Sequence, residues 1–180
     1  MRLDSILYRL FGTSIIVGPS IKRQLDFLRT KLPNDFKNRK ELFDLGCGDG
    51  KITLKLREIF QPRKIKGCDL SPYLVEMAKK RGIDAKVLDL EKEIPKGELG
   101  VMWGVLHHLE SPAKILANLK KNFQMLFLRE PLKIKNRLVS FLELGKPFQK
   151  GEIRELFIRI LGNKTKILEF QNTVFVFWKK

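Results

Sequence analysis

The sequence of 180 residues contains only two cysteines, no internal repeat and no long apolar run. Two cysteines are too few for a scaffold held together by disulfide bonds. No apolar stretch approaches the roughly 20 residues that are needed to cross a bilayer, so integral membrane association is not expected. The first 18 residues carry Asp4 and Arg9 within their apolar part and lack a small-residue cleavage site, which argues against a secretory signal. A cytoplasmic protein is therefore the expectation.

The sequence also lacks a pattern of metal ligands. Its cysteines and histidines are Cys47, Cys68, His107 and His108, and their spacing fits no structural zinc site. We therefore expect no metal cofactor.

Positive charge is in excess, with 36 Lys and Arg against 20 Asp and Glu, which gives a formal net charge of +16. Such an excess suggests an anionic partner, either nucleic acid, phosphate or a membrane surface. The excess is evenly distributed along the sequence, because residues 1–90 and 91–180 each contribute +8. The charge therefore leaves two interpretations open, a solvated Lys-rich surface and an RNA-binding protein.

The first 35 residues have a helical pattern. Apolar side chains recur at helical spacing from Leu3 to Phe11, and Gly18-Pro19 is expected to end this segment. Ser20 is expected to cap a second helix that ends before Pro33. We therefore predict a helical extension over residues 1–35, followed by a single domain over residues 36–180.

Short apolar runs and amphipathic helices alternate through the rest of the chain. This alternation predicts an α/β domain with a parallel sheet. Gln171-Asn172 separates the last two apolar runs, which predicts an antiparallel hairpin. The expected strands lie at 41–45, 65–70, 85–90, 99–105, 123–131, 164–170 and 172–180, and the expected helices at 51–60, 72–81, 112–122, 133–143 and 150–161.

A glycine-rich turn follows the first expected strand, in the sequence LFDLGCGDG. Gly46, Gly48 and Gly50 allow a ligand to lie against the backbone of this turn. The spacing G-x-G-x-G differs from the dinucleotide fingerprint G-x-G-x-x-G. Asp44 precedes the turn and disfavours a pyrophosphate, so this site suits a ligand that carries positive charge.

Two further aspartates follow the next two expected strands. Asp69 lies 19 residues after Gly50, where a carboxylate can accept hydrogen bonds from both ribose hydroxyls of a nucleoside. Asp89 ends the third expected strand and can accept a hydrogen bond from an exocyclic amine such as that of adenine, or can cap its own loop.

Together, these three acidic positions and the glycine turn resemble the class I S-adenosylmethionine-dependent methyltransferase family over residues 38–130. The resemblance implies a Rossmann-like, doubly wound sheet of seven strands, six parallel and one antiparallel, with a helical N-terminal extension. It also implies that S-adenosylmethionine is bound and S-adenosylhomocysteine released. The cofactor-binding residues that it implies are Asp44, Gly46, Cys47, Gly48, Gly50, Asp69, Leu70, Asp89, Leu90 and Trp103.

The segment WGVLHHLESP is similar to the corresponding stretch of small-molecule and lipid-precursor methyltransferases. It lacks the D/N-P-P-Y/F motif of DNA amino-methyltransferases. Cys47 and Cys68 lie inside the cofactor motifs, so neither is expected to act as the nucleophile of a cytosine-C5 enzyme. An RNA methyltransferase and a non-catalytic S-adenosylmethionine-binding protein remain the alternatives.

A candidate catalytic base is His108, because imidazole titrates near neutral pH and can remove a proton from the acceptor. Residues 1–20 and 131–161 are expected to cover the acceptor. Basic residues in or near these segments would favour an anionic acceptor, among them Lys22, Arg23, Lys133, Lys135 and Arg137. The acceptor and the oligomeric state are not determined by the sequence.

Overall fold

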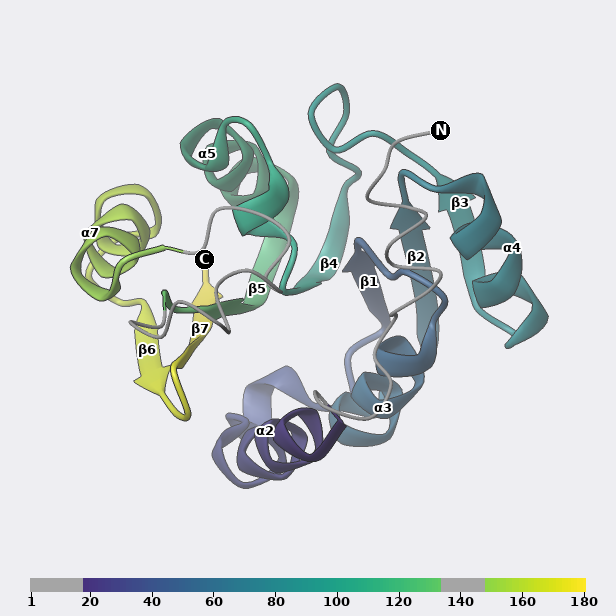
Figure 1. Ribbon diagram of the computed structural model, residues 1–180, viewed down its shortest axis with the longest axis horizontal. Coiled ribbons are helices and arrows are strands. Elements are labelled where there is room, and N and C mark those ends of the chain that lie inside the picture. Colours follow the sequence, from purple (N-terminus) through teal and green to yellow (C-terminus); the bar gives the residue numbers. More distant parts are fainter. Residues whose placement is uncertain (1–17, 134–147) are drawn as a thin grey trace.

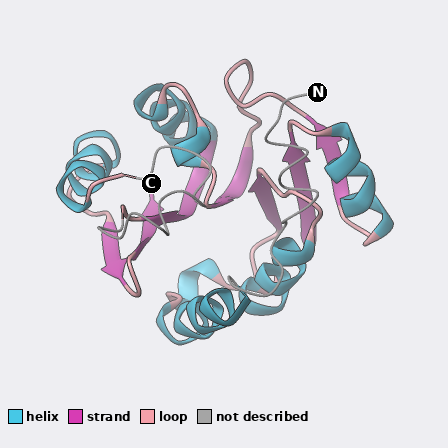
Figure 2. Cartoon of the chain, in the orientation of Figure 1, coloured by secondary structure: helices cyan, strands magenta, loops and turns pink. Residues whose placement is uncertain are grey.

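The computed structural model describes residues 18–133 and 148–180, in which helices cover a seven-stranded sheet (Figures 1 and 2). The strand order is β3-β2-β1-β4-β5-β7-β6. Strands β1 to β6 run in one direction, and β7 is antiparallel to both of its neighbours, which confirms the predicted fold class. The strands are β1 (Glu41–Leu45), β2 (Lys64–Asp69), β3 (Asp84–Val87), β4 (Gly97–Trp103), β5 (Phe123–Pro131), β6 (Lys166–Glu169) and β7 (Thr173–Lys179).

The predicted hairpin between the last two strands is confirmed. Gln171 and Asn172 connect β6 to β7 and both have positive φ angles, 49° and 53°. Consecutive left-handed residues give a turn whose twist matches that of the flanking antiparallel strands. This hairpin makes β6 one edge strand of the open sheet and places Thr173 beside the end of β5.

Helices pack on both faces of the sheet over two large apolar cores, and a third, smaller cluster includes Val75 and Ile83. Figure 1 shows α2 (Gly18–Lys31) and α3 (Lys51–Phe60) on one face and α5 (Pro112–Asn122) and α7 (Lys150–Leu161) on the other. The helix α4 (Pro72–Lys80) lies beside β3. The first core includes Leu28, Phe60, Phe127 and Phe175, and the second includes Leu45, Leu116, Phe157 and Trp178.

The start of α2 differs from the prediction. The helix begins at Gly18, two residues before the predicted cap, so Ser20 is not its N-cap. Proline is tolerated in a first turn because the amide there has no partner within the helix. Ser20 instead accepts a hydrogen bond from Gln24 Nε2 at 3.2 Å, one turn further on. The apolar positions expected at 3–11 and the helix expected at 133–143 lie outside the described residues, except for Lys133.

The connection between β3 and β4, residues 88–96, contains turns and no helix. On the face of β1 to β3 that points away from α3, the side chains of Phe43, Lys66 and Lys86 line a hollow of about 250 Å³. Strand β3 is therefore a short edge strand with charged side chains on this face.

Candidate functional site

The sequence-predicted site residues lie at the carboxyl ends of β1 and β2 and in the loops that follow β3 and β4. Asp44 is paired with Gly67 of β2 and with Val101 of β4. The backbone N–H groups of Gly46 and Cys47 both donate to the carbonyl oxygen of Cys68, at 2.8 and 2.9 Å. The turn after β1 is thus fixed to the end of β2, the arrangement in which open α/β sheets bind ligands.

The glycine turn requires glycine at its first and last positions. Gly46 and Gly50 have φ angles of 86° and 85°, in the left-handed region. A Cβ atom on Gly46 would lie 2.5 Å from a methyl group of Val105, and one on Gly50 would lie 2.4 Å from the Cδ1 atom of Ile83. Gly48 also has a positive φ angle, 54°. The turn therefore stays close to neighbouring side chains in a conformation that other residues rarely adopt.

Asp44 is a buried carboxylate with one oxygen left for a ligand. Its side chain accepts a hydrogen bond from Thr53 Oγ1 at 2.6 Å through Oδ2, whereas Oδ1 has no hydrogen-bond partner among the described residues. Burial raises the pKa of Asp44 to about 7; the hydrogen bond from Thr53 lowers it and the nearby charge of Asp69 raises it. A cationic ligand next to Oδ1 would stabilise the ionised form.

Asp69 organises the same turn from the end of β2. Its Oδ2 accepts a hydrogen bond from the Gly48 N–H at 2.9 Å, and its Oδ1 accepts one from the Ser71 N–H at 3.0 Å. Burial raises its pKa and these hydrogen bonds oppose the rise. Each carboxylate oxygen has a second lone pair, so Asp69 can still accept hydrogen bonds from a ligand.

Both cysteines have structural positions. Burial raises the pKa of Cys47, and it raises the pKa of Cys68 to about 12, so both remain thiols near neutral pH. A Cβ atom on Gly67 would lie 2.9 Å from the Sγ atom of Cys47, which shows how closely β2 approaches the turn. These environments fit the expectation that neither cysteine is a nucleophile.

Three large apolar side chains are about half exposed near the ends of β2 and β3: Leu70, Tyr73 and Val87. Leu70 is among the predicted site residues, whereas Tyr73 and Val87 are not. Val87 lies opposite Asp69 in the pairing of β3 with β2, so its position next to the aspartate was a usable signal. Exposed apolar side chains beside Asp69 provide a surface on which a flat ring can pack.

Asp89 and Leu90 lie beyond the end of β3, which is shorter than the sequence predicted. Asp89 accepts a hydrogen bond from the Glu91 N–H at 3.0 Å and forms an ion pair with Lys92 at 3.6 Å. The Leu90 side chain is buried in the apolar core that includes Leu106, rather than exposed beside Leu70. Of this pair, the carboxylate of Asp89 is the group that remains available to a ligand.

Trp103 ends β4 and packs away from the glycine turn. Its ring centroid lies 6.4 Å from that of Phe127 and 6.3 Å from that of Phe175. The guanidinium carbon of Arg129 lies 5.4 Å from the Trp103 ring centroid, and Arg129 Nε donates to Gln24 Oε1 at 2.9 Å. The side chain that lies against Gly46 from this loop is Val105.

The loop after β4 is held by Glu130, a fully buried residue of β5. Its Oε1 accepts hydrogen bonds from the N–H groups of Val105 and Leu106, both at 2.9 Å. Its Oε2 lies 2.7 Å from Nδ1 of His107, which is itself buried. His107 is thus part of the interior. His108 is exposed, with its ring 3.9 Å from that of His107.

The arrangement is matched by a known family. A family model described as a methyltransferase domain matches residues 20–159. The match spans most of the chain, which therefore belongs to the class I S-adenosylmethionine-dependent methyltransferase family.

Curated relatives match part of the chain. A segment of 68 residues is 35% identical to the trans-aconitate 2-methyltransferase of Rhodococcus jostii and covers 38% of this chain and 27% of that protein. A segment of 59 residues is 41% identical to an uncharacterized methyltransferase of Schizosaccharomyces pombe and covers 33% of this chain and 22% of that protein. The matches thus extend over about a quarter of each relative.

Solved structures share the fold at low identity. One is a chain of the complex between the Haloferax volcanii Trm112 methyltransferase activator and a putative methyltransferase, with a TM-score of 0.75, 12% identity, and coverage of 99% of this chain and 98% of that chain. Another is a possible histamine N-methyltransferase from Thermotoga maritima, with a TM-score of 0.70, 17% identity and 89% coverage of both chains. These likenesses concern the fold alone.

Within residues 18–133 and 148–180, no helix is long and apolar enough to cross a bilayer. No group of three or more His, Cys, Asp or Glu side chains in the same ranges is placed to hold a metal ion.

Proposed function

We propose that this protein transfers the methyl group of S-adenosylmethionine to a small-molecule or lipid-precursor acceptor. The observation that carries the proposal is the joint placement of Asp44, the glycine turn and Asp69 at the carboxyl ends of adjacent strands. Each part has a ligand group that fits it. The bound cofactor would supply an electrophilic methyl sulfonium.

Each part of the cofactor would be bound by different residues. Asp44 Oδ1 would accept a hydrogen bond from the cationic amino group, and the ligand would lie against the backbone of Gly46 and Gly48. Asp69 would accept hydrogen bonds from the ribose hydroxyls. Leu70 and Val87 would pack on the adenine ring, with Asp89 at its edge. This arrangement would leave the methyl group near the loop that Glu130 holds.

The acceptor class is supported by the relatives and by the loop after β4. The relatives include trans-aconitate 2-methyltransferases, and a structure with the same fold is a magnesium protoporphyrin IX methyltransferase. His108 is exposed on this loop and is our candidate base for removing a proton from the acceptor. Much of the acceleration would come from holding the acceptor in line with the methyl group.

The test is a methyl-transfer assay with radiolabelled cofactor against fractionated small-metabolite, lipid and RNA pools. Label in the metabolite or lipid fraction is expected. Label confined to RNA would show an RNA methyltransferase, the alternative that the net charge favours. Binding of S-adenosylhomocysteine without transfer to any pool would indicate a non-catalytic cofactor-binding protein.

A His108→Ala variant tests the candidate base, with His107→Asn as its comparison. If His108 is the base, the His108→Ala variant should have a lower kcat than the wild type and an unchanged affinity for S-adenosylhomocysteine. His107→Asn is expected to lower stability, because it disturbs the buried contact with Glu130. Equal kcat values in wild type and His108→Ala would exclude His108 as the base.

A further inference from the structure

Positive charge is evenly distributed along the sequence but not in space. Twelve basic residues lie where the parallel strands begin and where β7 ends, at the edge of the sheet opposite the candidate cofactor site. Four acidic residues lie among them: Asp35, Glu41, Asp84 and Glu98. The twelve, which we call the basic edge, are Lys37, Arg39, Lys40, Arg63, Lys64, Lys96, Lys120, Lys121, Lys164, Lys166, Lys179 and Lys180.

Hydrogen bonds show that parts of the basic edge distant in sequence are adjacent in space. The N–H groups of Arg63 and Lys64 donate to the carbonyl oxygens of Arg39 and Lys40, at 2.9 and 3.0 Å. Lys180 Nζ donates to the carbonyl oxygen of Lys121 at 3.1 Å. The residues just before β1 thus lie beside those at the start of β2, and the end of β7 lies beside the end of α5.

Carboxylates compensate only a few of these cations. Asp35 pairs with Lys179 at 3.1 Å, Glu98 with Arg39 at 3.6 Å, and Asp84 with Lys64 at 3.6 Å. Glu41 pairs with Lys66 on the neighbouring sheet face at 2.6 Å. Seven exposed members of the basic edge have no carboxylate within 4 Å in the described part of the chain; they are Lys40, Arg63, Lys96, Lys121, Lys164, Lys166 and Lys180. A concentration of unpaired cations creates a positive potential that attracts anions.

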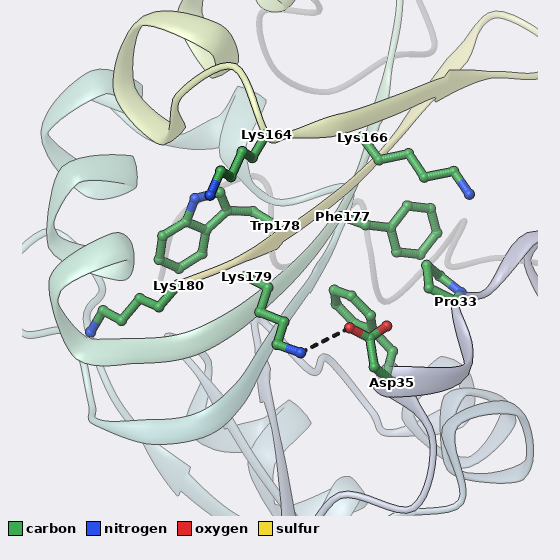
Figure 3. A pocket seen from close by; sticks show the side chains of 9 residues that line it. Pro33, Asp35, Lys164, Lys166, Phe177, Trp178, Lys179 and Lys180 are labelled. Carbon is green, nitrogen blue, oxygen red and sulfur yellow. Dashed lines mark hydrogen bonds and ion pairs between the residues drawn. The ribbon is translucent and has the colours of Figure 1, made fainter.

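A hollow of about 310 Å³ lies within the basic edge, between β6, β7 and the turn before β1. Figure 3 shows Lys164, Lys166 and Lys180 around it, with Lys166 and Lys180 pointing away from its centre. The aromatic side chains in its wall, Phe36, Phe177 and Trp178, are at most 4% exposed, so they offer no face on which a base can stack. The available chemistry is therefore that of lysine ammonium groups.

The chemistry of the basic edge distinguishes between two polyanions. A membrane-binding surface combines cations with apolar side chains that insert. In the described part of the chain, the exposed large apolar residues are Leu70, Tyr73 and Val87, which lie near the carboxyl ends of β2 and β3 instead. Lysines without apolar or aromatic partners suit the phosphates of a nucleic acid, which they bind as point charges.

We propose that the basic edge binds the phosphate backbone of nucleic acid without sequence preference. Seven strands at a spacing of about 4.8 Å give this edge a length of about 29 Å, enough to contact several successive phosphates. The edge points away from the candidate cofactor site. A nucleic acid bound here is a docking partner, and the acceptor site at the opposite edge stays open to a small molecule. The inference does not depend on the proposed function.

The test measures binding of a fluorescein-labelled 20-nucleotide RNA of mixed sequence by anisotropy across a range of salt concentrations. We expect binding at 0.15 M salt and a slope of log K against log salt of about −3, because each neutralised phosphate of a single strand contributes about −0.7. DNA of the same sequence should bind within about threefold of RNA, since the contacts are to phosphates.

Two variants with equal net charge distinguish the contribution of the basic edge to RNA binding from that of the total charge of the protein. The triple variant Lys121→Gln, Lys164→Gln and Lys180→Gln should bind RNA at least tenfold more weakly, with a slope shallower by about 2. The matched control Lys22→Gln, Lys114→Gln and Lys150→Gln removes three exposed lysines near the starts of α2, α5 and α7, outside the edge, and should change binding less than twofold. Both should bind S-adenosylhomocysteine like the wild type, which checks that they are folded.

Three results would overturn the proposal. The first is no binding of RNA or DNA by the wild type at 0.15 M salt. The second is equal weakening in both triple variants, which would mean that total charge alone is responsible. The third is binding to phosphatidylserine vesicles that exceeds binding to RNA at the same salt concentration, which would identify a membrane surface as the partner.

Discussion

Two carboxylates organise the candidate cofactor site, the buried Asp44 and the partly buried Asp69, and the charge of Asp69 raises the pKa of Asp44. Asp44 has one oxygen without a hydrogen-bond partner among the described residues, whereas Asp69 holds the glycine turn through two backbone amides. A ligand with a cationic group and a diol would satisfy both residues. The free-energy cost of ionising these carboxylates in the free protein would be reduced by such a ligand, which favours its binding.

Replacing Asp69 with alanine should lower the affinity for S-adenosylhomocysteine at least about tenfold. The substitution removes a charged acceptor, and a hydrogen bond to a charged group contributes about 1.5–3 kcal/mol. Isothermal titration calorimetry measures the change. Asp84→Ala is the matched control, because Asp84 is exposed at the start of β3 and its loss should leave the affinity unchanged. Equal affinity in wild type and Asp69→Ala would refute the assignment.

The stability of the ligand-free protein should depend on pH through Asp44. The pKa of this group rises from 3.8 to about 7 on folding, so its contribution to stability is present below about pH 4 and is lost as pH rises to 7. The melting temperature of Asp44→Asn should therefore exceed that of the wild type increasingly between pH 5 and 8, by several degrees at pH 8. Differential scanning calorimetry measures this difference.

Asp84→Asn controls for the substitution itself and should show no such trend with pH. A constant difference between Asp44→Asn and the wild type across this range would mean that Asp44 is not the titrating group. Saturating S-adenosylhomocysteine should reduce the difference, because its amino group would stabilise the ionised carboxylate.

At the scale of elements, the loop after β4 is positioned by β5 on one side and by the glycine turn on the other. Glu130 accepts two backbone hydrogen bonds from Val105 and Leu106, and the Val105 side chain lies against Gly46. A single buried carboxylate thus fixes how far this loop lies from the turn. The loop would otherwise depend on the η2 turn (Leu106–His108), a single short 3₁₀ segment.

Replacing Glu130 with alanine should destabilise the protein by about 3 kcal/mol or more. The loss leaves backbone N–H groups without acceptors, and each buried unsatisfied group costs about 1–3 kcal/mol. Glu130→Gln keeps one carbonyl oxygen and should cost less. Urea unfolding compares the two variants, with the exposed Glu155→Ala as a near-neutral control. If Gln and Ala were equally destabilising, the oxygen that faces Val105 and Leu106 would not be responsible.

The elements of the sheet were predictable because their signals are local. The runs at 41–45 and 123–131 are observed as β1 and β5 with the predicted bounds, and the helices at 51–60 and 150–161 are α3 and α7. Ser71 caps α4 by accepting a hydrogen bond from the Leu74 N–H at 3.4 Å. Ser111 makes no such side-chain bond to α5. Strand β3 ends three residues early, because the chain turns at Asp89.

Features of the site that depend on tertiary contacts were not predictable. Glu130 reads as one charged residue near the end of an apolar strand, and only the folded chain places it beside Val105 and His107. The aromatic contacts that turn Trp103 away from the glycine turn likewise come from β5 and β7. Asp44, the three glycines and Asp69 were predictable because a short sequence motif encodes them.

At the scale of the whole molecule, charge is polarised along the strand direction. The carboxyl ends of the strands carry Asp44, Asp69 and Asp89, and the opposite edge carries the basic residues described above. The overall charge of +16 thus coexists with an acidic site that suits a cationic cofactor.

Strand β3 is hydrogen-bonded to the sheet along one side only, and no helix connects it to β4. Its four residues should therefore exchange their amide hydrogens with deuterium soonest among the strands, whereas β5, enclosed by β4 and β7, should exchange last. Adenine packed on Val87 would close this weak edge. At a ligand concentration of 100 Kd, amide exchange in β3 should slow by up to about a hundredfold, whereas exchange in β5 should change less. The deuterium uptake of β3 would then report cofactor occupancy.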